Sequence, residues 1–172
     1  MPIRAAVLTI SDKASRGERV DTSGAAIAEL LATIDATVQR SDVVPDEAER
    51  IAATLRAWAD SEELDLIVTT GGTGLGPRDV TPEATAEVVE RPVPGLGEVM
   101  RAEGVKHTPM AALSRGVAGV RGRCLIVNLP GSEKGVRQNL SAVLDLLPHA
   151  VELLRGRVGD HPPQADAQPA RP

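Results

Sequence analysis

The residue types that could do chemistry are concentrated in one short stretch, the glycine loop at residues 71–79. It follows an apolar segment, and its glycines are Gly71, Gly72, Gly74 and Gly76. Because glycine accepts positive φ angles and lets backbone amides approach a ligand closely, such a loop can bind an anion. The loop ends in Arg78 and Asp79. A guanidinium beside bare amides suits a phosphorylated ligand, and a carboxylate suits a metal ion that accompanies phosphate.

A helix start is expected directly after the loop. Thr81 is the candidate N-cap and Pro82 falls in the first turn. Since helix N-termini attract anions, this start adds to the phosphate-binding character of the loop. Arg78 and Thr81 are therefore predicted to contact phosphate together with the glycines.

Composition limits the kind of protein this is. The 172 residues carry a net charge of −5 and include no Phe, no Tyr and a single Trp. The acidic balance and the lack of aromatic side chains argue against nucleic-acid binding, and the charge gives no attraction to anionic membranes. No apolar run has the length of a membrane span and no signal-peptide core follows the N-terminus, so we expect a cytoplasmic protein. The lone Cys124 lies in an apolar run and is expected to be buried.

Strands and helices are expected to alternate along the chain. The apolar pattern predicts strands at 3–10, 36–44, 64–70, 117–120 and 124–129, the last two forming either a hairpin or a strand that leads into a core strand. It predicts helices at 23–33, from 45 onward, at 81–89, at 96–104 and at 132–154, the last bent near Pro148. In the second helix, Ile51, Leu55 and Trp58 share one face, so Trp58 is expected in the core or at a subunit contact.

This alternation predicts an α/β fold with three layers, α/β/α, around a mostly parallel sheet. Residues 1–156 are expected to form one domain, and the Pro-rich residues 157–172 a disordered tail. Ligands of such sheets bind beyond the carboxyl ends of the strands. The loops expected at that edge carry Ser11, Asp12, Asp46, Asp79 and the turn Pro130-Gly131-Ser132. Three carboxylates and two amide-rich turns should therefore converge there.

Two common phosphate motifs and one catalytic motif are excluded. Gly71 and Gly76 have P-loop spacing, but Pro77 stands where the motif needs lysine. The loop lacks the third glycine of a dinucleotide fingerprint. No histidine accompanies a serine in a nucleophile-elbow context, so a nucleophilic triad is not expected.

Asp46 and Asp79 are the predicted catalytic pair. Two carboxylates facing an amide cradle would hold Mg²⁺ between phosphate oxygens or orient an attacking group. Phosphoryl or nucleotidyl transfer needs mainly positioning and charge neutralisation, which these residues can supply. Each has a structural alternative, namely N-capping of the second helix for Asp46 and an ion pair with Arg78 for Asp79.

Five blocks together resemble a known family, the MogA/MoaB group of molybdopterin adenylyltransferases, which is related to the gephyrin G domain. The similarity runs from about Ile3 to Leu154. The blocks, in chain order, are Thr70-Gly71-Gly72-Thr73-Gly74, residues 78–85 (Arg-Asp-Val-Thr-Pro-Glu-Ala-Thr), residues 94–101 (Pro-Gly-Leu-Gly-Glu-Val-Met-Arg), Leu113-Ser114-Arg115 and Leu129-Pro130-Gly131.

The resemblance implies a homotrimer in which the terminal phosphate of molybdopterin attacks the α-phosphate of MgATP, giving adenylyl-molybdopterin and pyrophosphate. It implies that Asp46 and Asp79 are the functional aspartates and Mg²⁺ ligands. It assigns the nucleotide phosphates to Gly71, Gly72, Thr73 and Gly74. It assigns molybdopterin to Ser114, Pro130, Gly131 and Ser132. Ser11 and Asp12 match a block of less certain role, and a transient contact with the molybdate-insertion enzyme is expected.

Two alternatives remain open. A paralogue of this fold could bind or deliver molybdopterin without adenylylating it, since a fold alone does not settle function. The scaffold could also serve another pyrophosphate-cleaving enzyme of the competence-damage type. Retention of the whole Arg78-Asp79-Val80-Thr81 sequence favours an active adenylyltransferase.

Overall fold

The computed structural model describes residues 1–156. Within them, six strands form one sheet in the order β2-β1-β3-β6-β5-β4. The four strands β1 (Ile3–Ile10), β2 (Ala36–Val44), β3 (Leu66–Thr70) and β6 (Cys124–Leu129) run parallel. β5 (Ala118–Arg121) pairs antiparallel with β6 and with the short edge strand β4 (Arg91–Pro92). The expected mostly parallel sheet is confirmed.

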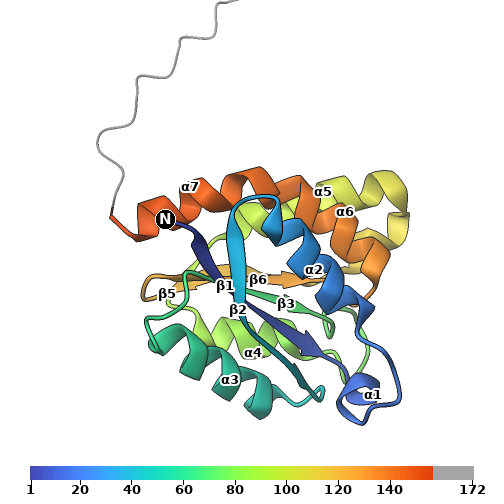
Figure 1. The fold of residues 1–172 in the computed structure, drawn as a ribbon. Helices are drawn as coiled ribbons and strands as arrows, with labels where there is room; N and C mark the ends of the chain where they lie inside the picture. Colours follow the sequence, from blue (N-terminus) through green and yellow to red (C-terminus); the bar gives the residue numbers. More distant parts are fainter. Residues whose placement is uncertain (157–172) are drawn as a thin grey trace, which may run out of the picture.

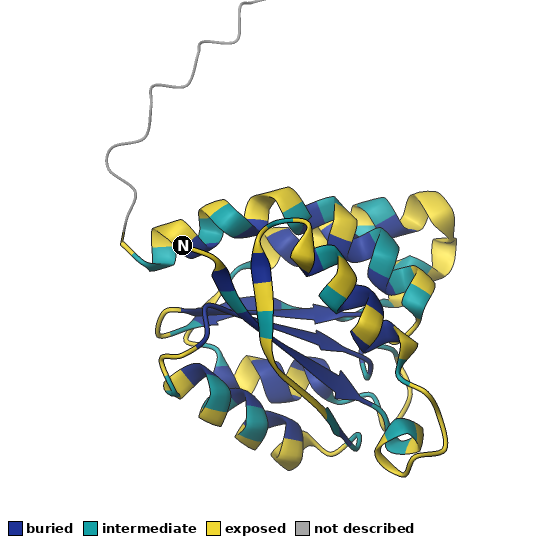
Figure 2. Ribbon diagram, in the orientation of Figure 1, coloured by how far each residue is buried: buried dark blue, intermediate teal, exposed yellow. Residues whose placement is uncertain are grey.

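The register of the parallel strands brings their carboxyl ends to one edge. Ile10 pairs with Val44, Thr9 with Thr70, and Thr70 with Leu129. The central strands are buried on both faces, as their unbroken apolar runs require (Figure 2). Every loop that leaves these strands therefore starts from the same edge, and the sheet itself sets where the site lies.

Helices cover both faces of the sheet (Figure 1). One face carries α2 (Thr22–Ala32), α5 (Pro94–His107), α6 (Glu133–Val143) and α7 (Leu147–Leu154). The other carries α3 (Ala48–Asp60) and α4 (Thr81–Val88), with Ile51 and Leu55 fully buried and Trp58 packed against the same core. The three-layer prediction is thus confirmed. No helix among residues 1–156 is long and apolar enough to cross a membrane.

Several predicted elements need correction. The helix expected over 132–154 is two helices, α6 and α7, separated by the 3₁₀ turn η2 (Leu144–Leu146), and Pro148 lies in the first turn of α7 rather than at a bend. Proline fits there because a first-turn N–H has no helical partner. Three further short elements were not expected: α1 (Asp12–Ser15), the edge strand β4 and the 3₁₀ helix η1 (Pro109–Leu113). The predicted tail, 157–172, lies outside the described residues.

The hairpin between β5 and β6 forms as predicted. Gly122 has a φ of +56° and completes the turn. Cys124 is 1% exposed, and burial raises the pKa of its thiol to about 12. A thiol that stays protonated is a poor nucleophile, so Cys124 acts as a small core residue, as expected.

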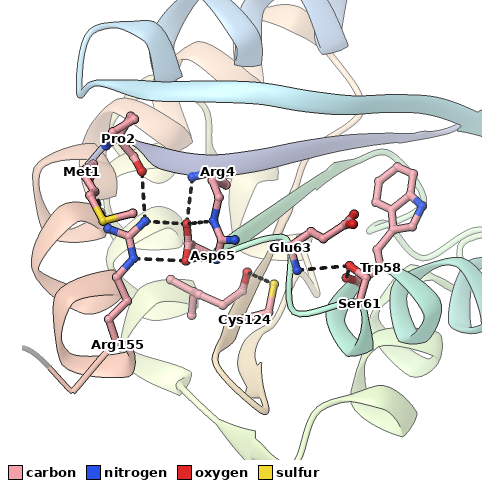
Figure 3. Close-up of polar contacts among 10 residues, drawn as sticks. Met1, Pro2, Arg4, Trp58, Ser61, Glu63, Asp65, Cys124 and Arg155 are labelled. Atoms are coloured by element: carbon pink, nitrogen blue, oxygen red, sulfur yellow. Dashed lines mark hydrogen bonds and ion pairs between the residues drawn. The ribbon is translucent and has the colours of Figure 1, made fainter.

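At the amino ends of β1 and β3, opposite the glycine loop, the buried carboxylate of Asp65 connects several chain segments (Figure 3). Asp65 is 3% exposed. Arg4 donates to both carboxylate oxygens, with Nε–Oδ2 and Nη2–Oδ1 distances of 3.0 Å. Arg155 at the end of α7 donates to the same carboxylate, with an Nη2–Oδ2 distance of 2.6 Å, and to the carbonyls of Met1 and Pro2. The two ends of the described chain are thereby joined through one buried charge.

Burial alone would raise the pKa of Asp65, but hydrogen bonds from Arg4 and Arg155 outweigh it. The pKa of this carboxyl therefore lies well below its usual range. A carboxyl with a depressed folded-state pKa contributes stability that is complete above the unfolded-state pKa, about 3.9, and is lost as the pH falls below it.

We predict that Asp65→Asn lowers the free energy of unfolding by about 3 kcal/mol at pH 7, because two arginines lose a buried partner. Urea titration measures this loss, and the gap between wild type and variant should narrow as the pH falls below about 4. The matched control is Asp60→Asn, which removes the exposed pair with Arg121 and should cost much less. An equal loss in both variants, or a gap independent of pH, would contradict the assigned role.

Candidate functional site

The glycine loop leaves β3 between two neighbouring strands. Gly71 has a φ of +100°, its N–H donates to the Leu129 carbonyl at 3.1 Å, and a Cβ there would lie 2.1 Å from the Ile10 carbonyl oxygen. A Cβ on Gly131 would lie 3.3 Å from the Gly71 Cα. Three backbone segments therefore meet without side chains, which leaves backbone at the surface of the site, as the predicted anion cradle requires.

Gly72 is the second position where only glycine fits. Its φ is +67°, and a Cβ would lie 2.3 Å from the Thr81 hydroxyl oxygen and 3.2 Å from Asp46 Oδ1. The loop backbone thus passes directly over a predicted catalytic carboxylate.

Thr81 lies beneath the loop and forms hydrogen bonds with its backbone. It is fully buried, its hydroxyl donates to the Gly71 carbonyl at 2.9 Å, and its N–H donates to the Gly72 carbonyl at 3.1 Å. The N-cap of α4 is Val80, with no side-chain capping bond, so the expectation of Thr81 as N-cap is wrong. The hydroxyl satisfies a loop carbonyl instead, because the loop turns back over the helix start.

Asp12 and Asp46 hold each other through reciprocal hydrogen bonds. The Asp12 N–H donates to Asp46 Oδ2 at 2.9 Å, and the Asp46 N–H donates to Asp12 Oδ1 at 3.0 Å. The N-cap of α3 is Glu47, so Asp46 does not cap that helix. The capping alternative for Asp46 is wrong, because the carboxylate turns toward the loop after β1.

Arg78 pairs with Asp12 rather than with Asp79. Its Nε and Nη2 lie 3.0 and 2.9 Å from the two Asp12 oxygens. The alternative of an Arg78–Asp79 ion pair is therefore wrong. Arg78 lines a hollow between the start of α3 and the end of the glycine loop, which Asp46 and Pro77 line as well. In this arrangement the guanidinium orders Asp12 and stands outside the anion cradle.

Asp79 closes the glycine loop on itself. Its Oδ2 accepts from the Gly76 N–H at 2.8 Å, and its own N–H donates to the Gly76 carbonyl at 3.0 Å. Among residues 1–156, Asp79 Oδ1 accepts no hydrogen bond, so this oxygen is available to a ligand. Oδ2 thus holds the Asp79 side chain in place, and Oδ1 can bind a ligand.

The three carboxylates differ in their electrostatic surroundings. Burial raises the pKa of Asp46, and the nearby charges of Asp12 and Asp79 raise it further. Hydrogen bonds from Arg78 and from the Asp46 amide hold the pKa of Asp12 below its usual range. The pKa of Asp46 is thus raised first by burial and then by neighbouring negative charge, whereas Arg78 pairs directly with Asp12 and not with Asp46.

Two cavities open beside the glycine loop. The first, which we call the Asp21 cavity, has a volume of about 300 Å³ and lies between the loop and the segment that enters α2. Its polar lining includes Ser11, Arg19, Asp21, Ser23 and Asp46. Arg19, Asp21 and Ser23 were not predicted; the only sequence signal for them is the long polar loop that follows β1.

The second cavity, the Ser114 cavity, has a volume of about 390 Å³ and lies between the loop, η1 and α6. Thr73, Gly74, Ser114 and Pro130 line it, as do the apolar Met110 and Leu113. The turn before α6 is well anchored: the Thr70 hydroxyl donates to the Pro130 carbonyl at 2.6 Å, the Ser23 hydroxyl to the Gly131 carbonyl at 2.8 Å, and Ser132 caps α6.

The two cavities share one wall. Its members belong to the lining of both and are Gly72, Asp79, Gly131 and Ser132. Most of the predicted site residues are thus brought together around two adjoining chambers. Arg78, Asp12 and Thr81 are not in either lining and act as supports.

Fold and site together define an α/β protein with a divided, amide-rich ligand edge. A sequence profile described as "Probable molybdopterin binding domain" matches residues 6–149. The chain is 44% identical over 156 residues to the molybdopterin adenylyltransferase of Helicobacter pylori (strain J99), covering 90% of this chain and 89% of that protein. It is 48% identical to the molybdenum cofactor synthesis protein cinnamon of Drosophila melanogaster, covering 86% of this chain but a quarter (25%) of that longer protein.

A solved structure agrees with these similarities. The molybdopterin biosynthesis enzyme MoaB from Thermus thermophilus superposes with a TM-score of 0.85 at 60% identity, covering 90% of this chain and 97% of the other. The chain belongs to the molybdopterin-binding domain family of molybdenum cofactor biosynthesis. The family predicted from the five sequence blocks is confirmed.

We predict that Gly72→Ala destabilises the protein by about 2 kcal/mol, since a left-handed residue gains a Cβ. The same change also displaces Thr81 or Asp46. Thermal unfolding measures the loss. Gly95→Ala is the matched control, because nothing lies within 4 Å of its Cβ position and its φ is not in the left-handed region. Equal melting temperatures for the two variants would show that the loop tolerates a side chain.

Proposed function

We propose that this protein adenylylates molybdopterin with ATP. The observation that carries the proposal is the shared wall, because it lets one ligand in each cavity meet the other at Asp79 and the glycine loop. The similarity to proteins named molybdopterin adenylyltransferase, over nine-tenths of the chain, supports the same reaction. In that reaction a terminal phosphate oxygen of molybdopterin bonds to the α-phosphorus of ATP, the bond to the β-phosphate breaks, and pyrophosphate leaves.

We assign the nucleotide to the Asp21 cavity and molybdopterin to the Ser114 cavity. The first is lined mainly by polar groups and by the backbone of Gly71 and Gly72, which suits phosphates and ribose hydroxyls. The second adds the apolar Met110 and Leu113 to the polar Ser114, which suits a flat pterin ring with polar edges. Thr73 and Gly74 then lie on the molybdopterin side of the loop.

Asp46 and Asp79 are suited to hold Mg²⁺ jointly with substrate phosphates. Each carboxylate has one oxygen engaged by a backbone amide, Asp46 with Asp12 and Asp79 with Gly76, and neither has a cationic side-chain partner among residues 1–156. No cluster of three or more metal-binding side chains occurs in that part of the chain, so a metal here needs phosphate oxygens as further ligands, as Mg²⁺ commonly does. When bound, the ion would neutralise charge on the phosphates.

The chain's own groups supply position and charge. Backbone N–H groups of the loop and of Gly131-Ser132 neutralise phosphate charge where it develops, without moving during the reaction. Asp46 and Asp79 orient the reacting phosphates from both sides of Gly72. No covalent intermediate on the protein is required, in keeping with transfer chemistry that depends on positioning.

The proposal also covers the oligomeric state of the protein and its location in the cell. Exposed apolar side chains on α5 and η1, among them Val99, Val105 and Met110, support a homotrimer. A transient contact with the molybdate-insertion enzyme and a cytoplasmic location stay predictions.

The proposed reaction is tested by incubating the protein with molybdopterin, ATP and Mg²⁺ and detecting the AMP adduct by mass. A protein that binds molybdopterin tightly without forming the adduct would be a carrier of the same fold. Release of pyrophosphate without an adduct would indicate another nucleotide-processing enzyme.

We predict that Asp79→Asn slows adduct formation roughly 100-fold or more, because the transfer point loses a charge, while molybdopterin binding changes little. Single-turnover mass detection and a binding titration separate the two effects. Asp145→Asn on the exposed turn η2 is the control and should behave as wild type. Wild-type turnover in Asp79→Asn would remove Asp79 from the mechanism.

Asp46→Asn is expected to slow the reaction by a similar factor, because the group that faces Gly72 loses its negative charge. Part of this loss arises from the weakened bond to the Asp12 amide, which thermal unfolding detects separately. Unchanged turnover would leave Asp46 a structural partner of Asp12 only.

A further inference from the structure

Arg115 contacts the glycine loop at three points, although it lies more than thirty positions later in the chain. Its Nε donates to the Gly74 carbonyl at 2.8 Å and its Nη2 to the Asp79 carbonyl at 2.7 Å. Its backbone N–H donates to the Thr73 carbonyl at 2.8 Å. One residue therefore holds both ends of the loop segment from Gly74 to Asp79.

The segment that Arg115 holds is ordered by polar contacts and not by apolar packing; the others are the Arg78–Asp12 pair and the bonds between Gly76 and Asp79. Leu75 is 66% exposed, and Gly76, Pro77 and Arg78 are exposed as well, so no apolar burial fixes this part of the loop. Glycines raise the entropic cost of fixing a backbone, and exposed loops without buried contacts open readily. The position of Asp79 therefore depends on hydrogen bonds, and the two from the Arg115 guanidinium are charge-assisted.

Arg115 itself has a firm base. Arg101 on α5 donates from Nη1 to the Gly116 carbonyl at 2.9 Å and to the Ser114 carbonyl at 3.4 Å. The remaining Arg115 nitrogen, Nη1, pairs with Glu83 in α4. The clamp thus joins the segment after η1 to the start of α4, with the glycine loop between them.

We propose that Arg115 is a positioning residue that fixes Asp79 and links it to the Ser114 cavity. Ser114, the preceding residue, and Thr73, whose carbonyl Arg115 holds, both line that cavity. A ligand that orders this wall also orders the carbonyl of Asp79, so occupation of the Ser114 cavity sets the carboxylate at the shared wall. The expected loss of turnover in Arg115 variants rests on the proposed function, whereas the expected faster amide exchange in the loop does not.

Only arginine can serve in this way. Its planar guanidinium presents several donors in a fixed geometry and reaches two carbonyls and a carboxylate at once, whereas lysine carries a single nitrogen. A role that depended on charge alone would be restored by lysine. A role that depends on bridging Gly74 and Asp79 would not.

The test is amide hydrogen exchange of Gly76 and Asp79, whose N–H groups are bonded within the loop. In Arg115→Met and in Arg115→Lys we expect exchange about tenfold faster than in wild type. Arg137→Met, which removes an arginine paired with Glu29 on α2 and with Glu133 on α6, is the matched control and should leave the loop unchanged. Wild-type exchange in Arg115→Met, or full rescue by lysine, would overturn the proposal.

Glu83→Gln separates the carbonyl clamp from the ion pair with α4 and stays informative if Arg115→Met does not fold. It keeps both carbonyl bonds, so loop exchange should remain within about twofold of wild type. Exchange as fast as in Arg115→Lys would assign the ordering to the ion pair and overturn the clamp.

In the adenylylation assay, the Arg115 variants should lose kcat about thirtyfold while the KM for ATP changes little, because a misplaced carboxylate harms the transfer step more than nucleotide binding. An increase in KM alone would contradict a role in positioning. If wild type forms no adduct, the proposed reaction fails, and the exchange measurement still decides whether Arg115 orders the loop.

Discussion

The site depends on the absence of side chains where three backbone segments meet at the sheet edge. A Cβ on Gly71 would strike the Ile10 carbonyl, and Gly131 packs directly on Gly71. Because these positions are bare, the loop after β3 can pass between β1 and the turn after β6. Residues of the loop then line both cavities, and Asp79 lies in the wall between them. Every role proposed for the loop follows from this close approach of backbone.

Around this meeting point, some side chains have an oxygen without a hydrogen-bond partner in the described part of the chain, and others form hydrogen bonds that hold the loop and the carboxylates in place. Asp46 and Asp79 each use one oxygen to bind a backbone amide and present the other. A second group of side chains forms hydrogen bonds with other parts of the protein; its members are Asp12, Arg78, Thr81 and Arg115. Buried polar groups in this network are satisfied: no buried side-chain N or O among residues 1–156 lacks a partner. Satisfied polar groups fix the positions of the side chains that make them, which suits chemistry that works by positioning.

Prediction from the sequence succeeded where local pattern decides structure. Unbroken apolar runs identified the buried strands, and the helical spacing of Ile51 and Leu55 identified the face of α3. It failed where a partner distant in sequence decides. Thr81 and Asp46 have the residue types and positions of N-caps, yet tertiary bonds to Gly71 and Asp12 turn them elsewhere. Arg78 also has a partner that the sequence did not indicate, because Asp12, 66 positions away, binds its guanidinium; a contact of Arg78 with phosphate stays a prediction.

By itself, the sequence determined the alternating α/β order, the position of the glycine loop at the carboxyl end of a strand, and the family. Each follows from composition or from residues close together in the chain. Only the tertiary structure decided that the ligand edge is divided into two cavities, that Arg19 and Asp21 line one of them, and that Arg115 clamps the loop. Side chains at that edge come from different strands, so their pairing depends on strand register and loop path, which no local pattern encodes.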